Sequence, residues 1–215
     1  MEISNRRPIK TRSAAWASIT ARMLAKAGFT PNRVSVIGVF IALAGAGAFV
    51  ASSHQSSAAA AALLVGGAVA IQLRLLCNML DGLIAVENGL KSKLGDVFNE
   101  VPDRIEDVAL LLGAGLAAGG AHGITLGWLA ALLAIGTAYI RLLGGSLGVN
   151  QDFCGPFAKP QRMFFLTVFA LGAAAEAVTS QTTWSLTGGL TLIVLGTAAT
   201  LGRRLVRLAR ALHAR

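Results

Sequence analysis

The acidic side chains of this 215-residue sequence are gathered in one short segment. Seven of its 10 Asp and Glu residues lie between Asp81 and Asp107. On helices, two sets of residues would each share one face, namely Asn78, Asp81 and Ala85, and then Asn99, Asp103 and Asp107. Two antiparallel helices joined by a short loop would bring these carboxylate and amide oxygens together. Such oxygens are ligands for Mg²⁺, Mn²⁺ or Ca²⁺, so the spacing predicts a divalent-cation site.

The elements that carry this segment are predicted to be membrane helices. Hydrophobic residues make up 54% of the chain and charged residues 13%, about half the roughly 25% of an average soluble domain. Four stretches contain no Asp, Glu, Lys or Arg: 34–73, 108–140, 163–175 and 177–202. A span needs about 20 residues, and polar or glycine-rich breaks divide the longer stretches. We therefore expect an all-α integral membrane protein with six transmembrane helices, near 33–51, 58–80, 95–119, 124–147, 162–178 and 184–202.

The positive charges predict how these helices are oriented. Lys and Arg residues precede the first helix, follow the last, and lie between the second and third and between the fourth and fifth. The other three loops have none. The positive-inside rule then places both termini in the cytoplasm of a multi-pass protein of the bacterial inner membrane. The net charge of +9 is thus an orientation signal and does not indicate nucleic-acid binding.

Three regions are predicted along the chain: a basic leader over 1–32, a six-helix catalytic domain over 33–202 and a basic cytoplasmic tail over 203–215. In the leader, Trp16, Ile19 and Met23 recur at helical spacing beside Arg22 and Lys26. This pattern predicts an amphipathic helix in the cytoplasmic membrane interface. A disordered basic leader is the alternative.

The acidic segment has a structural interpretation as well as a functional one. Its acids could form a solvated loop that balances Lys91, Lys93 and Arg104. A carboxylate at membrane depth, however, costs about 2.5–3.5 kcal/mol on permissive insertion scales, and apolar residues would avoid this cost. The free-energy cost favours a function, and the spacing of the segment decides between the two interpretations.

This spacing resembles the signature of the CDP-alcohol phosphotransferase family, D-x2-D-G-x2-A-R-x8-G-x3-D-x3-D. The residues that match it are Asp81, Gly82, Ala85, Gly95 and Asp103. The residues that depart from it are Asn78 and Asn99, at the first and third Asp, and Val86, at the Arg. Every spacing is kept over 26 positions. The chain therefore resembles a variant subgroup of the family with Asn at these two positions.

The resemblance implies a membrane enzyme that transfers a substituted phosphate from a CDP-linked donor. Family members bind two divalent ions at the four acidic positions, and these ions hold the diphosphate of the donor. Carried onto this chain, the resemblance implies Asp103 as catalytic base and a set of ligands for Mg²⁺ or Mn²⁺ made of Asn78, Asp81, Asn99 and Asp103. It implies a binding site for the CDP donor at Asp81, Gly82, Ala85 and Gly95. It also implies a homodimer.

The departures from the pattern bear on the metal. Two Asn in place of Asp remove two negative charges, so a single ion or weaker binding is an alternative to two ions. Glu100 and Asp107 are candidates to restore the charge. Arg74 lies on the same helical face as Asn78, and we expect it to neutralise buried acids.

Arg141, Lys159 and Arg162 lie on the predicted cytoplasmic side. The family resemblance makes them candidates for binding the phosphate of an anionic acceptor or lipid headgroup. The alternative is topology alone, because basic residues are stabilised near anionic lipid by about 1 kcal/mol each.

The leading functional hypothesis is a metal-dependent transferase of phospholipid synthesis. It would move a phosphatidyl-type group from CDP-diacylglycerol to a small alcohol, release CMP, and contact membrane lipids throughout. One alternative uses a soluble CDP-alcohol with diacylglycerol as acceptor. Others are a non-catalytic membrane protein that binds lipid or nucleotide, and a small transporter.

Overall fold

The computed structural model describes residues 15–87, 94–180 and 182–214, and these ranges contain seven helices and no strand. The helices are α1 (Ala15–Lys26), α2 (Pro31–Ser52), α3 (Ser57–Glu87), α4 (Gly95–Ala118), α5 (Gly120–Ser146), α6 (Lys159–Thr179) and α7 (Trp184–His213). The first 14 residues of the predicted leader, and Lys91 and Lys93, lie outside the described residues.

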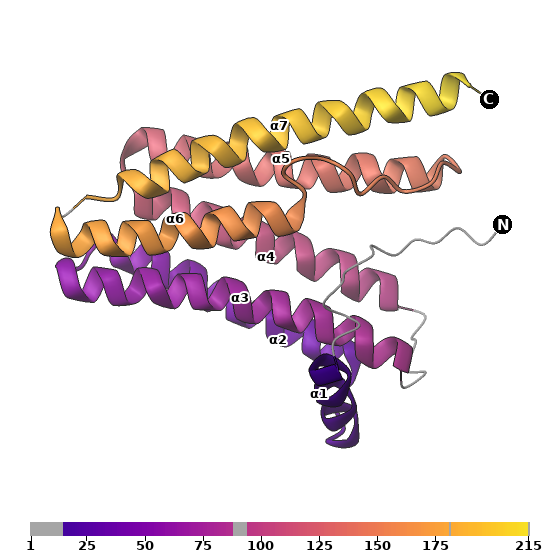
Figure 1. The fold of residues 1–215 in the computed structure, drawn as a ribbon, viewed down its shortest axis with the longest axis horizontal. Helices are drawn as coiled ribbons and strands as arrows, with labels where there is room; N and C mark the ends of the chain where they lie inside the picture. The colour runs from indigo at the N-terminus through magenta and orange to yellow at the C-terminus, as the bar shows by residue number, and fades with distance from the viewer. Residues whose placement is uncertain (1–14, 88–93, 181, 215) are drawn as a thin grey trace.

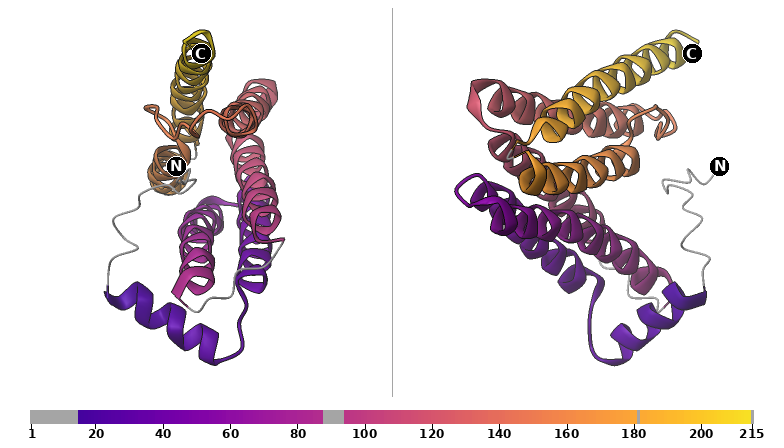
Figure 2. Two further views of the ribbon diagram at one scale, coloured as in Figure 1. Left: turned by 90° about the vertical axis from the view of Figure 1, so that its right-hand side faces the viewer. Right: turned by 60° about the vertical axis from the view of Figure 1, so that its left-hand side comes forward.

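The six long helices form a closed ring. Going around it, α2 packs on α3, α3 on α6, α6 on α7, α7 on α5, α5 on α4, and α4 on α2 again (Figures 1 and 2). The helix α1 lies across one end of this bundle and packs on α3 (Figure 1). The ring therefore brings α6, far along the chain, beside α3, which carries the first half of the motif.

The connections alternate between the two ends of the bundle. Residues 53–56, the α4–α5 turn at Gly119 and the α6–α7 connection lie at one end (Figure 1). The end of α3, the start of α4, the 147–158 segment and the end of α7 lie at the other. Of the Lys and Arg residues that the topology argument used, those within the described ranges lie toward the second end, so for these residues the charge pattern and the fold agree.

Small residues let neighbouring helices approach closely. A Cβ atom at Gly113 of α4 would lie 2.8 Å from the Cα atom of Ala46 in α2, and one at Gly115 would lie 2.7 Å from the Cα atom of Gly127 in α5. Both contacts are backbone contacts, so larger side chains would push the helices apart. These contacts fix α4 between α2 and α5.

Five helices, α2, α3, α5, α6 and α7, are long and apolar enough to cross a membrane. The sixth member of the ring, α4, has 24 residues but carries charges along its first half: Asp96, Glu100, Asp103, Arg104, Glu106 and Asp107. Composition therefore supports a membrane protein with several spans, and the count of six stays a prediction.

The helices run further than the sequence predicts at two places. The α3 helix continues to Glu87, and α7 continues to His213, through most of the predicted tail. The reason for the second extension is Arg204, whose side chain is buried and donates to the carbonyl oxygen of Thr137 at 2.8 Å. An arginine expected to face solvent in the tail thus anchors α7 to α5.

A helix forms where the leader's amphipathic pattern predicted one. Its small residues Ala17 and Ala21 are buried in a cluster with residues of α3, whereas Trp16, Ile19 and Met23 are at least half exposed. That this exposed apolar face of α1 lies in the membrane interface stays a prediction.

Candidate active site

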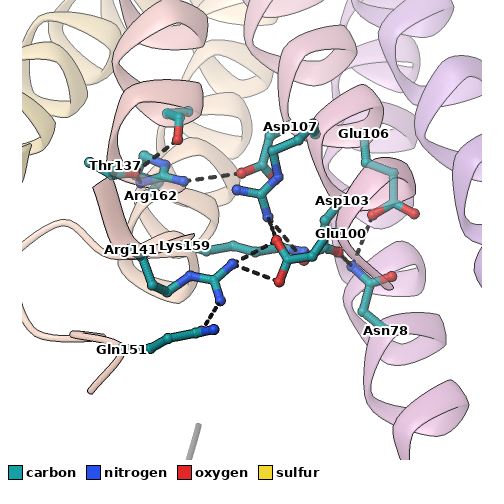
Figure 3. Close-up of polar contacts among 12 residues, drawn as sticks. Asn78, Glu100, Asp103, Glu106, Asp107, Thr137, Arg141, Gln151, Lys159 and Arg162 are labelled. Carbon is teal, nitrogen blue, oxygen red and sulfur yellow. Dashed lines mark hydrogen bonds and ion pairs between the residues drawn. The ribbon is translucent and has the colours of Figure 1, made fainter. Parts of the chain in front are cut away.

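The motif faces of α3 and α4 meet in the structure. The Nδ2 atom of Asn78 donates to Oδ1 of Asp103 at 2.7 Å and to Oε2 of Glu106 at 2.9 Å (Figure 3). Only the nitrogen of a carboxamide can donate a hydrogen bond. The atom of Asn78 that contacts both carboxylate oxygens is therefore its amide nitrogen. Asn78 is therefore a hydrogen-bond donor that joins two acids of α4.

Asp103, the predicted catalytic base, is held by three donors. Its Oδ1 atom accepts from Asn78 and from the ammonium group of Lys159 at the start of α6. Its Oδ2 atom accepts from Arg104 at 3.3 Å. The side chain is 19% exposed, so it lies at the edge of the buried cluster, where a substrate can reach it.

Asp81 lies in a different environment from Asp103. It is 6% exposed, and its Oδ2 atom accepts from the hydroxyl of Ser35 in α2 at 2.7 Å. Its buried Oδ1 atom has no hydrogen-bond partner among the described residues. A buried carboxylate oxygen without a partner is costly, which makes this oxygen a candidate cation ligand.

The helix α2 leaves room beside this group at Gly38. A Cβ atom there would lie 2.7 Å from Oε1 of Glu106 and 3.6 Å from Oδ1 of Asn78. The Oε1 atom of Glu106 is buried and likewise has no partner in the described part of the chain. Ser35 and Gly38, about one turn apart, therefore face oxygens of both motif helices.

Behind the motif residues lies a buried network of ion pairs. Arg74 bonds Glu106 at 3.0 Å and Asp107 at 2.5 Å, and Arg162 bonds the other oxygen of Asp107 at 3.1 Å. All four side chains are at most 2% exposed. The expectation that Arg74 neutralises buried acids is confirmed.

The two acids considered as replacements for the missing charge are engaged elsewhere. Both oxygens of Asp107 bind arginines, and Arg141 binds both oxygens of Glu100 at 2.6 Å (Figure 3). A carboxylate that already neutralises a guanidinium is a poor cation ligand, so neither replaces the missing charge. The carboxylate that joins the motif cluster instead is Glu106.

The remaining residues expected to hold the donor and the metal lie along the same two helices. Gly82 and Ala85 are partly buried in α3 after Asp81, and Gly95 begins α4. Asn99 is exposed, one turn before Asp103 on α4. The structure thus brings Asn78 to Asp103 directly and leaves Asn99 facing outward.

A cavity of about 380 Å³ is linked to this site through Arg141, which lines the cavity and bonds Glu100 of α4. Its polar lining comes from α5, the 147–158 segment and α7: Arg141, Asn150, Gln151, Asp152, Arg204 and Arg207. Of the three basic residues proposed for an anionic acceptor, Arg141 lines this cavity. Lys159 and Arg162 are instead paired with carboxylates of α4.

The arginines of the cavity are neutralised to different degrees. Arg207 pairs with Asp152 at 3.1 Å, whereas Arg204 donates to the carbonyl oxygens of Thr137 and Cys154 and forms no ion pair within the described ranges. Partial burial opposes ionisation of Asp152, but hydrogen bonds from Cys154 and Arg207 outweigh it and lower the pKa of Asp152. The lining therefore retains excess positive charge that suits an anion.

Few side chains of the site are free to bind a divalent cation. In the described ranges no three His, Cys, Asp or Glu residues form a group that could hold a metal. The available donors are instead mixed: the free oxygen of Asp81, and the carboxamide oxygen of Asn78 three residues earlier on α3. Carboxylate and amide oxygens suit Mg²⁺ and Mn²⁺. These residues fit one divalent cation.

Sequence reasoning missed several members of this site. Glu106 follows Asn99 by seven residues and so shares its helical face, a signal that could have identified it. Ser35 and Gly38 belong to a helix outside the motif. Arg204 and Arg207 were assigned to the cytoplasmic tail, and no local pattern distinguishes them from orientation charges.

No protein-family model matches the chain. It is 24% identical over 189 residues to the phosphatidylinositol phosphate synthase of Mycobacteroides abscessus, a match that covers 86% of this chain and 80% of that protein. The structure of the Mycobacterium tuberculosis phosphatidylinositol phosphate synthase with CDP-DAG bound is similar, with a TM-score of 0.75 and 23% identity over 91% of this chain and 94% of that one. The complex of that enzyme with manganese and citrate has a TM-score of 0.74 at 23% identity, covering 89% and 88%. The chain therefore has the fold of phosphatidylinositol phosphate synthase, and these matches support the CDP-alcohol phosphotransferase family that its motif resembles.

Proposed function

We propose that this protein is a membrane transferase that moves the phosphatidyl group of CDP-diacylglycerol to a small alcohol and releases CMP. The observation that carries the proposal is the meeting of Asn78, Asp81 and Asp103 at one end of α3 and α4, with the spacing of the family motif. The names of the relatives support it, as does the similar fold of a synthase that binds CDP-DAG.

In this reaction Asp103 is the group that takes the proton of the acceptor. The acceptor hydroxyl attacks the phosphorus that carries the diacylglycerol, its proton passes to Asp103, and the bond from that phosphorus to the oxygen of CMP breaks. Asn78 and Lys159 position the Asp103 carboxylate by bonding its Oδ1 atom. Phosphoryl transfer depends mainly on such positioning and on charge neutralisation.

The donor would lie along the motif helices. Gly82, Ala85 and Gly95 have small side chains or none, which leaves space for the nucleotide beside Asp81. A divalent cation, Mg²⁺ or Mn²⁺, held by Asp81 and by the amide oxygen of Asn78, would neutralise the charge of the donor diphosphate.

We assign the arginine-lined cavity to an acceptor alcohol that carries a phosphate group. Arg141 lines the cavity and also bonds Glu100, which lies three residues before Asp103 on α4. This contact links the lining of the cavity to the helix that carries the proposed base, and Arg204 supplies a guanidinium without a carboxylate partner in the described ranges. The name of the relatives makes an inositol phosphate the first acceptor to test.

The location follows from the charges and the ring of helices. Six spans with both termini in the cytoplasm would place the motif at the cytoplasmic side of a bacterial inner membrane. The acyl chains of the donor could then stay in the leaflet during the reaction. A homodimer remains part of the proposal, and the abundant Gly and Ala of the helices would permit close packing between subunits.

The experiment measures CMP release by the purified protein in lipid. The protein receives CDP-diacylglycerol, Mg²⁺ or Mn²⁺, and a panel of free alcohols and alcohol phosphates that includes an inositol phosphate. We expect CMP release with an alcohol phosphate, loss of it in Asp103→Asn, and normal release in Glu176→Gln, which changes an acid at the opposite end of the bundle. Wild-type release no greater than that of Asp103→Asn would refute the enzymatic function.

The same assay separates the alternative donor. If CDP-choline with diacylglycerol supports CMP release and CDP-diacylglycerol does not, the protein belongs to the other reaction type. The arginine-lined cavity favours the first outcome, because diacylglycerol has no charge for its arginines to bind.

A further inference from the structure

The carboxylates around Asn78 are already matched by positive charges of the chain. Lys159 bonds Asp103, Arg74 bonds Glu106 and Asp107, and Arg162 bonds Asp107 (Figure 3). These contacts join α3, α4 and α6, and Arg104 of α4 itself adds a contact to Asp103. The centre of the motif is therefore stabilised by internal ion pairs.

Asp81 is the exception in this group of acids. Its partner is the neutral hydroxyl of Ser35, and none of the ion pairs formed by the described residues includes it. It is 6% exposed and has an oxygen atom without a partner. A buried carboxylate outside the ion pairs of the described residues is the place in this group where an external cation would be most stabilising.

Asn78 separates these two environments. Its nitrogen atom donates toward Asp103 and Glu106, on the side with ion pairs. Its oxygen atom lies on the side of Gly38, where a Cβ atom would be 3.6 Å from it. An amide can present a donor to one side and a cation ligand to the other, which a carboxylate cannot do.

We propose that the site takes one divalent cation, at the free oxygen of Asp81, and that the ammonium group of Lys159 serves Asp103 in place of a second ion. The inference rests on the proposed function for the class of ligand, a divalent cation beside a diphosphate. It predicts that the number of ions depends on Lys159, although Lys159 itself binds no metal.

Mn²⁺ binding to the purified full chain, followed by electron paramagnetic resonance with MnCl₂ alone, tests this directly. We expect one Mn²⁺ per chain in the wild type and loss of that ion, with affinity at least tenfold weaker, in Asp81→Asn. In Lys159→Met, the Oδ1 atom of Asp103 loses its cation while Oδ2 keeps its contact with Arg104, and we expect a second Mn²⁺ to bind at Oδ1. The control Lys26→Met loses the same charge at an exposed position of α1, and it should still bind one Mn²⁺.

The double variant Lys159→Met with Asp103→Asn removes both members of the ion pair, and it should return to one Mn²⁺. Two ions or none in the wild type, unchanged binding in Asp81→Asn, or a single ion in folded Lys159→Met would each overturn the proposal. If Lys159→Met does not fold, the wild-type stoichiometry and Asp81→Asn still decide.

The readout is independent of catalysis. One ion with no CMP release would leave this inference standing and refute the proposed function. CMP release by a wild-type protein that binds two ions would support the proposed function and refute this inference.

Discussion

The carboxamide of Asn78 bridges two carboxylates of α4, and this position determines which chemical group the site tolerates there. Its nitrogen lies 2.7 Å from Asp103 and 2.9 Å from Glu106. A carboxylate would accept where a donor is needed and would add a third negative charge at contact distance. Asn at this position is therefore a requirement of the cluster, because its side chain supplies a hydrogen-bond donor as well as an oxygen atom.

Asn78→Asp should consequently destabilise the metal-free protein. Breaking a buried pair so that charge is left uncompensated costs about 3–5 kcal/mol, and we expect a loss of this order. SDS unfolding in mixed micelles with a chelator measures it. Asn99→Asp is the matched control, because Asn99 is the other Asn of the motif and is exposed on α4, and it should change stability little. Equal stability of the two variants would show that the hydrogen bonds of Asn78 do not stabilise the fold.

The lowered pKa of Asp152 predicts that the stability of the fold depends on pH. Partial burial raises its pKa, but the hydrogen bonds from Cys154 and Arg207 outweigh this and hold the pKa below its usual value. A carboxyl group whose pKa is lower in the folded state stabilises the fold above its unfolded pKa of about 3.9. The contribution is lost as the pH falls through the folded pKa.

Wild type should therefore be more stable than Asp152→Asn at pH 7, by no more than about 1 kcal/mol for a partly exposed pair. The difference should shrink as the pH is lowered from 5 toward 3, values that bracket the unfolded pKa of about 3.9. Thermal unfolding of both proteins in detergent across this range measures it. A difference that grows in acid would contradict the assigned pKa direction.

Among the helices, α2 supports the site without contributing a motif residue. Its Ser35 bonds Asp81, and its Gly38 gives space to Glu106 and Asn78. The position of α2 depends in turn on its contact with α4, where Gly113 meets the backbone of Ala46. A change at this contact therefore reaches the site through the position of a whole helix.

Gly113→Ala should separate these helices. The added Cβ atom would lie 2.8 Å from the Cα atom and 2.9 Å from the oxygen of Ala46, and overpacking of this kind costs about 1–3 kcal/mol. We expect lower stability and a lower rate of CMP release. Gly47→Ala makes the same change on α2 where the Cβ atom meets nothing within 4 Å, and it should preserve both. The two measurements are detergent unfolding and the CMP assay, and equal effects of both variants would refute this account.

How far the sequence predicts these elements depends on the range of the interactions. The charge-free stretches identify α2, α3, α5, α6 and α7, and local spacing predicts that Asn78 meets Asp103. The pairing of Lys159 with Asp103 joins residues 56 positions apart, and it depends on the register of α6 against α4, which no local pattern specifies. Arg204 was misplaced for a similar reason, since its partners lie in α5 and in the 147–158 segment.

For the whole molecule, the ring of helices and the charge distribution together constrain the topology. Five helices are apolar enough to span a membrane, and α4 is the exception. Yet α4 packs between α2 and α5 in the ring, and its ends lie at opposite ends of the bundle (Figure 1). If α2 and α5 cross the bilayer, α4 must cross beside them. Its charges are compatible with this, because most of them are paired with residues of α3, α5 and α6.

The topology can be decided at the turn between α4 and α5. With six spans, Ser53 and His122 face the outside and Ala214 faces the cytoplasm. With five spans, omitting α4, His122 moves to the cytoplasmic side and the two termini lie on opposite sides. In a background with Cys77→Ser and Cys154→Ser, the single changes Ser53→Cys, His122→Cys and Ala214→Cys report each position, all three being exposed. We expect a membrane-impermeant maleimide to label the first two in spheroplasts and the third only after lysis. Labelling of His122→Cys only after lysis would mean that α4 does not span the membrane, and the acidic cluster would then lie in a re-entrant element.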